Sequence, residues 1–173
     1  MNYLFYAAIA FILVIVKTSL LMPFPVLPDL FQPVLLIAVY LGLFRPGTSY
    51  GLLSVFLGYM LDLFSGGHAG FHMITIPVIY YFTSMLRGRF FLESRFFRGV
   101  YTAGMVLLHD IVATGVFALV TDSQLTTSLL FEGVVFRMLF NGLLCVPLFK
   151  LMSDIEIHWA PLSARKSTGI SVD

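Results

Sequence analysis

Long runs of hydrophobic residues make up most of the chain, and short segments rich in proline, glycine or charge separate them. The runs do not alternate between apolar and polar residues, as the strands of a membrane barrel would. Backbone polar groups in lipid must find partners within the protein, so runs of this length predict helices. The pattern predicts an all-α integral membrane protein, a compact bundle with six spans at residues 3–22, 30–44, 48–64, 71–86, 100–120 and 128–152.

The segments between the runs contain residues that end helices. Residues 22–28 include three prolines, which remove backbone donors and clash with the preceding turn. Arg45, Pro46 and Gly47 end the second run. The chain becomes polar after the last run. We therefore expect a six-helix transmembrane domain over residues 1–152 and a cytoplasmic C-terminal tail over residues 153–173.

The composition points to the same class of protein. Of the 173 residues, 59% are hydrophobic and 11% are charged, whereas about a quarter of the residues of a soluble domain are charged. So few charged groups could not cover a water-soluble globule. The formal net charge of +1 gives no indication of nucleic-acid binding.

Lysine and arginine are unevenly distributed over the segments between the predicted spans. They occur after the second, fourth and sixth spans and are absent after the first, third and fifth. Positively charged loops tend to stay in the cytoplasm. The distribution predicts a multi-pass protein with both termini cytoplasmic.

Several charged residues and one amide lie inside the predicted spans. They are Lys17, Asp62, Asp110, Glu132, Arg137 and Asn141. A charge at the bilayer centre costs roughly 2.5–3.5 kcal/mol on insertion scales unless it finds a partner. We expect Arg137 to pair with Asp110 or Asp62, and Lys17 to pair with another acid or to reach toward the interface. These contacts would fix the packing and register of the helices. The alternatives are a proton or ion relay, or exposure to a ligand or partner through an outward-facing cavity.

The segment between the third and fourth spans contains a glycine-rich motif. Its residues are Gly58, Asp62, Gly66, Gly67 and Gly70. The carboxylate ends an apolar run, and the glycines allow a tight turn before the next run begins. We expect an outward-facing structural corner with a partner-binding role.

The chain carries no motif of an enzyme or of a metal site. We find no nucleophile elbow, phosphate-binding loop or zinc-binding helix. His68 and His72 flank the turn after Asp62, but no third ligand of suitable geometry is visible. Cys145 is the single cysteine, which excludes an internal disulfide. We expect no catalytic residue, cofactor or bound metal.

The motif at residues 58–70, followed by a span that ends near Tyr80 and Tyr81, resembles the MreD family of bacterial rod-shape determinants. The Pro-Asp-Leu sequence at residues 28–30 matches this family too. The resemblance implies a non-enzymatic component of the inner membrane that supports lateral peptidoglycan synthesis and cell shape. It also implies binding to an MreC-like protein and, through it, to MreB, a RodA-type glycosyltransferase and a class B penicillin-binding protein.

The same resemblance suggests an alternative. MreD proteins are similar to the substrate-binding S components of energy-coupling-factor vitamin transporters, so this chain could be such a subunit. A small proton-coupled permease is a third possibility, and it rests on Asp62 and Asp110 alone.

Overall fold

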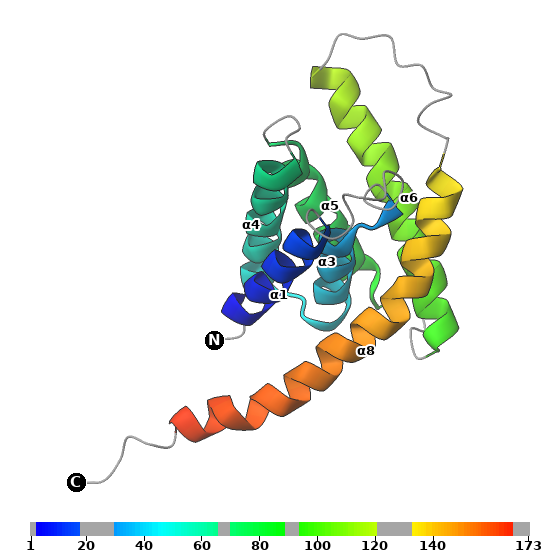
Figure 1. Cartoon of the computed structure of the whole chain (residues 1–173). Coiled ribbons are helices and arrows are strands. Elements are labelled where there is room, and N and C mark those ends of the chain that lie inside the picture. The colour runs from blue at the N-terminus through cyan, green and yellow to red at the C-terminus, as the bar shows by residue number, and fades with distance from the viewer. Residues whose placement is uncertain (1–2, 18–29, 66–69, 89–93, 121–132, 168–173) are drawn as a thin grey trace, which may run out of the picture.

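The computed structural model describes residues 3–17, 30–65, 70–88, 94–120 and 133–167. All regular secondary structure in these ranges is helical, as the hydrophobic pattern predicts (Figure 1). The helices are α1 (Tyr3–Ile15), α3 (Pro33–Phe44), α4 (Thr48–Ser65), α5 (Phe71–Leu86), α6 (Arg95–Val120) and α8 (Val134–Ser167). Gly66, Gly67, His68 and Glu132, as well as parts of the first and last predicted spans, lie outside the described residues.

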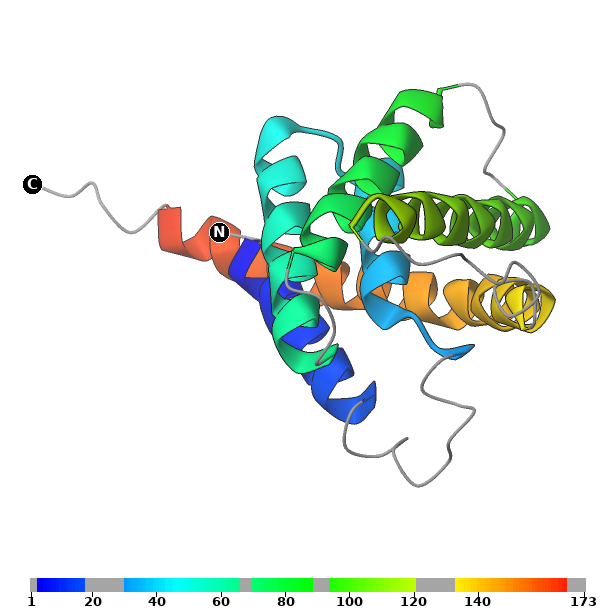
Figure 2. The same cartoon turned by 90° about the horizontal axis from the view of Figure 1, so that it is seen from above.

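The helices α6 and α8 pack side by side, and α8 continues beyond the bundle (Figures 1 and 2). Gly99 and Gly142 face each other at this contact, where a Cβ on either glycine would lie 3.0 Å from the other's carbonyl oxygen.

The helix α8 runs to Ser167, past the expected end of the last span at residue 152. Residues 153–160 contain neither glycine nor proline, and Arg45 forms an ion pair of 3.1 Å with Glu156. The first part of the polar tail is therefore helical.

Two of the described helices are long and apolar enough to cross a membrane, over Phe96–Val116 and Val134–Ile157. The other described helices have shorter apolar stretches of 10–17 residues. At 1.5 Å per residue, α3 is about 18 Å long, compared with about 30 Å for the hydrocarbon core of a bilayer. Helix length alone therefore supports two spans, and the count of six stays a prediction.

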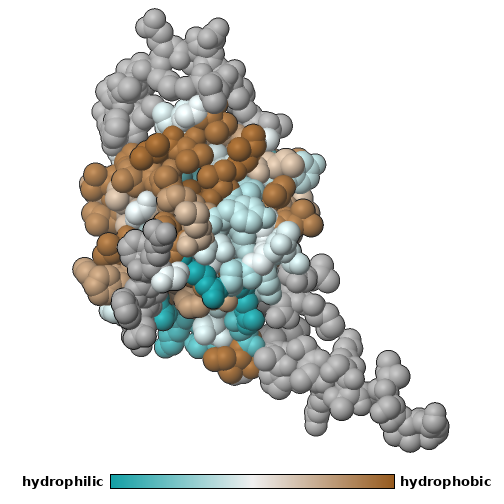
Figure 3. Space-filling view, turned by 180° about the vertical axis from the view of Figure 1, so that it is seen from behind, coloured by the Kyte–Doolittle hydropathy of each residue, from teal (hydrophilic) through white to brown (hydrophobic). Residues whose placement is uncertain are grey.

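Large hydrophobic side chains cover much of the outer surface of the bundle. Leu143 of α8 is 77% exposed and Phe96 of α6 is 74% exposed. The face seen from behind carries a broad apolar area above a smaller polar one (Figure 3). Soluble monomers rarely expose large contiguous apolar patches, so contact with lipid or with a partner explains this surface.

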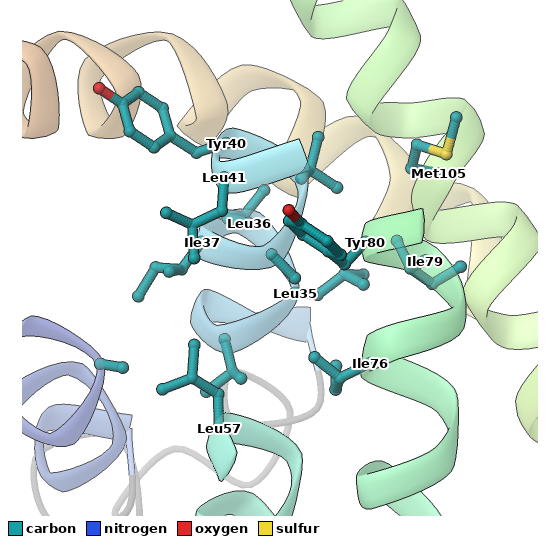
Figure 4. Packing of buried hydrophobic residues seen from close by; sticks show 14 of the residues in the cluster. Leu35, Leu36, Ile37, Tyr40, Leu41, Leu57, Ile76, Ile79, Tyr80 and Met105 are labelled. Atoms are coloured by element: carbon teal, nitrogen blue, oxygen red, sulfur yellow. The ribbon is translucent and has the colours of Figure 1, made fainter. Parts of the chain in front are cut away.

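The short helix α3 forms the centre of the bundle. It is hydrophobic on all sides, which is typical of a helix in a protein core or of a membrane span. From Val34 to Leu41 no residue is more than 3% exposed. Figure 4 shows α3 surrounded by Leu57 of α4, Ile76 and Ile79 of α5 and Met105 of α6. Pro33 occupies the first turn of α3, where its missing N–H has no helical partner to lose.

The turn between α3 and α4 is held by a tyrosine of α5. The hydroxyl of Tyr80 accepts a hydrogen bond from the Gly47 amide at 2.9 Å and lies 2.8 Å from the Gly47 carbonyl oxygen, to which it can donate. The ring is fully buried. This contact fixes the C-terminal half of α5 against the start of α4.

Candidate functional site

The carboxylate of Asp62, in the last turns of α4, caps the start of α5. Its Oδ2 accepts hydrogen bonds from the amides of Gly70 and Met73, both at 3.0 Å. Its Oδ1 accepts one from the amide of His72 at 2.9 Å and contacts the His72 ring Nδ1 at 2.8 Å. The first amides of a helix have no partner within the helix, and a negative charge near them is favourable. Asp62 therefore provides hydrogen-bond acceptors for the amides at the start of the neighbouring helix α5.

Two glycines make this capping contact possible. Gly58 lies one turn before Asp62 on α4, and a Cβ there would come within 2.8 Å of the Met73 Cα. Gly70 has a φ of +92°, a left-handed conformation that favours glycine. We name Gly58, Asp62, Gly70, His72 and Met73 the α4–α5 joint. The structure brings together three of the five motif residues, and Gly66 and Gly67 lie outside the described residues.

Asp62 and Asp110, both inside the predicted spans, contact different groups: Asp62 contacts His72, whereas Asp110 contacts Arg137. Asp110 Oδ2 lies 3.3 Å from Arg137 Nε, so of the two acids that the sequence offers to Arg137, Asp110 is the one in contact. His109 Nδ1 lies 3.4 Å from Asp110 Oδ1. The ring of His109 stacks on that of His72, with 6.4 Å between centroids. Asp62 contacts His72 and the amides of α5.

Asn141 connects α8 to the start of α3. Its Nδ2 donates hydrogen bonds to the carbonyl oxygens of Leu30 at 2.7 Å and Arg137 at 2.8 Å. Its Oδ1 accepts a bond from the Gln32 amide at 3.1 Å. The side chain is fully buried and uses both ends of its amide. Asn141 is thus a contact between helices one turn away from Arg137.

A cavity of about 230 Å³ lies at this end of the bundle. Its polar lining comes from Lys17, Gln32, His72, His109 and Arg137. Lys17 and Arg137, far apart in sequence, thus share one space, while Glu132 lies outside the described residues. The cavity is smaller than the roughly 300–1,000 Å³ of pockets that enclose a drug-sized ligand.

Sequence reasoning did not include His72, His109 or Gln32 in the charge network. Each lies within one or two turns of a helix end or beside an acid, and polar residues at such places inside a hydrophobic run are the signal that could have found them. Among the described residues, no group of three or more His, Cys, Asp and Glu side chains is placed to hold a metal ion.

Comparison of the chain with curated proteins and with solved structures gives no significant match. The family model of the rod shape-determining protein MreD matches residues 1–155. This range includes the α4–α5 joint and all the residues that line the cavity. It covers most of the 173 residues of the chain. The chain therefore belongs to the MreD family, whose members are membrane proteins that determine rod shape.

Proposed function

We propose that the chain acts in rod-shape determination as a non-enzymatic, six-span protein of the bacterial inner membrane. It binds an MreC-like protein and, through it, works beside MreB, a RodA-type glycosyltransferase and a class B penicillin-binding protein to support lateral peptidoglycan synthesis. The observation that carries this proposal is the family match over residues 1–155. The exposed apolar sides of α6 and α8 support it, since they suit contact with lipid and with the helix of a membrane-anchored partner.

We assign a partner-binding role to the surface beside the α4–α5 joint. The four contacts to Asp62 hold the end of α4 rigidly against α5. Leu63, the next residue, is 58% exposed. A fixed helix end with an exposed apolar side chain supplies a preorganised contact, because little side-chain and loop freedom is lost on binding.

The test is depletion of the protein in its host, followed by complementation. We expect depletion to turn rods into spheres and a tagged wild-type copy to restore rods and to co-purify the MreC-like protein. Leu63→Ser should reduce this co-purification. Leu52→Ser is the matched control, because Leu52 is 71% exposed nearer the other end of the same helix.

Rod shape that persists after depletion would contradict the proposed function. Equal co-purification by the Leu63 and Leu52 variants would contradict the assigned surface and leave the function intact. The alternative of a vitamin-binding transporter subunit has no support from the comparisons, and it would require loss of vitamin uptake with normal shape.

A further inference from the structure

We propose that a groove between α5 and α6 binds one acyl chain of an anionic glycerophospholipid, whose headgroup lies beside Arg87. The groove has a volume of about 430 Å³. It shares no lining residue with the polar cavity or with the α4–α5 joint. This lipid site goes beyond the proposed role in shape determination and does not involve the MreC-like partner.

The lining of the groove is hydrophobic and open to the outside of the bundle. α5 contributes Phe82 and Leu86, and α6 contributes residues between Val100 and Ile111. Phe82 is 40% exposed and Ile111 is 60% exposed. Gly104 lies in the middle of the α6 side, and a Cβ there would meet no atom within 4 Å. The missing side chain therefore leaves an apolar space that suits a hydrocarbon chain.

The length of the groove matches one leaflet of a bilayer. On α6 the lining runs from Val100 to Ile111, a rise of about 16 Å at 1.5 Å per residue. The hydrocarbon core is about 30 Å thick. The groove begins where the predicted span 100–120 begins, so it reaches from one membrane surface to about the middle. A lipid chain of one leaflet has this reach, whereas the spanning helix of a partner needs a contact along the whole thickness.

A basic segment follows the groove at the end where α5 ends. Arg87 comes directly after Leu86, which lines the groove, and its side chain is exposed. It opens the connector of residues 87–98, which contains four arginines and one glutamate in the sequence. One glutamate neutralises one arginine at most, so the connector stays positive wherever Glu93 lies. Basic sites between membrane helices on the cytoplasmic side are typical of binding to anionic headgroups.

The groove and the basic residue have different effects on binding. Apolar surfaces gain no hydrophobic energy by meeting each other within a bilayer, so the groove alone accepts the chain of any phospholipid. The attraction of an anionic lipid to one basic residue near the surface is about 1 kcal/mol, which corresponds to about fivefold in affinity. The groove therefore positions the chain, and Arg87 sets the preference for an anionic headgroup.

The test uses the full-length protein, purified in a neutral detergent and washed free of lipid. Phosphatidylglycerol and phosphatidylcholine with the same acyl chains are titrated separately, and native mass spectrometry records the bound lipid. Glycerol phosphate serves as a headgroup without chains. We expect phosphatidylglycerol to bind about fivefold more tightly than phosphatidylcholine, and glycerol phosphate not to bind measurably.

Gly104→Leu tests the groove, because the new side chain would fill the space of the acyl chain. We expect phosphatidylglycerol binding to weaken about fivefold or more, as for other overpacked sites. Gly115→Leu is the matched control on the same helix. A Cβ at Gly115 also meets nothing within 4 Å, and this glycine does not line the groove. The control should change binding by less than about twofold.

Arg87→Gln tests the headgroup contact and also serves if Gly104→Leu does not fold, since position 87 is exposed. We expect it to lower the preference for phosphatidylglycerol over phosphatidylcholine about fivefold. Lys150→Gln, which removes an exposed cation from α8 outside the groove, is the control and should keep the preference.

Equal binding of the two phospholipids to the wild-type protein would overturn the proposal. So would equal effects of Gly104→Leu and Gly115→Leu, which would leave only a general attraction of headgroups to the basic surface. If a partner helix occupies the groove, Gly104→Leu should leave lipid binding unchanged and abolish co-purification of the MreC-like protein. Lipid binding is measured without the partner, so failure here is distinguishable from failure of the proposed function.

Discussion

At the scale of single residues, Asp62, Asp110, Arg137 and Asn141 each contact specific polar groups of neighbouring helices. Asp62 accepts from three backbone amides and contacts one imidazole nitrogen, and Arg137 meets Asp110. Asn141 uses both ends of its amide between two helices. Polar groups inside a low-dielectric environment are costly unless they are bonded. These residues therefore stabilise the arrangement of the helices.

We expect Asp62→Asn to destabilise the protein by about 1–3 kcal/mol. The amide group of asparagine would oppose amide donors of α5 that now point at a carboxylate oxygen. The measurement is the thermal unfolding midpoint in detergent. Ser153→Ala, which removes an exposed hydroxyl group from α8, is the control and should change stability by less than about 0.5 kcal/mol. Similar midpoints for the two variants would argue against the capping role.

We expect Arg137→Leu alone to destabilise the bundle more than Arg137→Leu combined with Asp110→Leu. Removal of one partner leaves the other as an uncompensated charge in a mostly buried place. A double-mutant cycle on unfolding free energies should give a coupling of about 0.5–3 kcal/mol. Purely additive losses would show that the contact between Asp110 and Arg137 contributes nothing to stability.

At the scale of helices, close approach at glycine decides how neighbours pack. The contact of α4 with α5 places a glycine against backbone, and the contact of α6 with α8 places two glycines against each other. Close backbone contact at small residues is the usual way helices associate in membranes. The hydrophobic runs predicted the individual helices, but they could not show which glycines lie at contacts within the bundle.

We expect Gly58→Ala to destabilise the protein by about 1–3 kcal/mol, the usual cost of overpacking. The new methyl group would meet backbone atoms of His72 and Met73, which cannot move without shifting α5. Gly104→Ala on α6 is the matched control, since a Cβ there would meet nothing within 4 Å. The control should be neutral or slightly stabilising, because alanine favours helix. Unfolding midpoints that fall equally in both variants would contradict the close contact.

At the scale of the whole molecule, the polar network and the basic connecting segments lie at opposite ends of the bundle. The cavity gathers residues from the end of α1 and the starts of α3, α5 and α8. Arg45, at the other end of α3, pairs with Glu156 beyond the last predicted span. This polarity agrees with the distribution of lysine and arginine along the chain. The short central helix α3 is enclosed by its neighbours, and the six-span arrangement stays a prediction.

We expect reporter cysteines to distinguish the two sides of the membrane. In a Cys145→Ser background, a cysteine at position 88 should react with a membrane-impermeant maleimide only after the inner membrane is opened. A cysteine at position 122 should react in intact spheroplasts. Cys145 is buried, so its replacement by the similar serine is a mild change. The same accessibility at both positions would contradict six spans.

The sequence by itself determined the helical class and the family, and it predicted some helix bounds, whereas α6 begins at Arg95 and not at the predicted residue 100. The fourth predicted span and α5 have the same bounds, 71–86, and the third differs from α4 by one residue. Helix bounds depend on the local hydrophobicity and on glycine and proline residues, whose effect on the backbone extends over only a few positions. The sequence did not predict the extension of α8 past residue 152, because the polar composition of this segment indicated a tail and not a continuing helix.

Only the tertiary structure decided which polar groups meet. Asp110 was one of two possible partners for Arg137, and the capping role of Asp62, the stacking of His72 on His109 and the cavity could not be derived from the sequence. These contacts join helices far apart along the chain. They depend on the rotation and depth of each helix, which the packing around α3 sets. A hydrophobic run indicates that a helix is buried, but it does not state which neighbour each polar side chain faces.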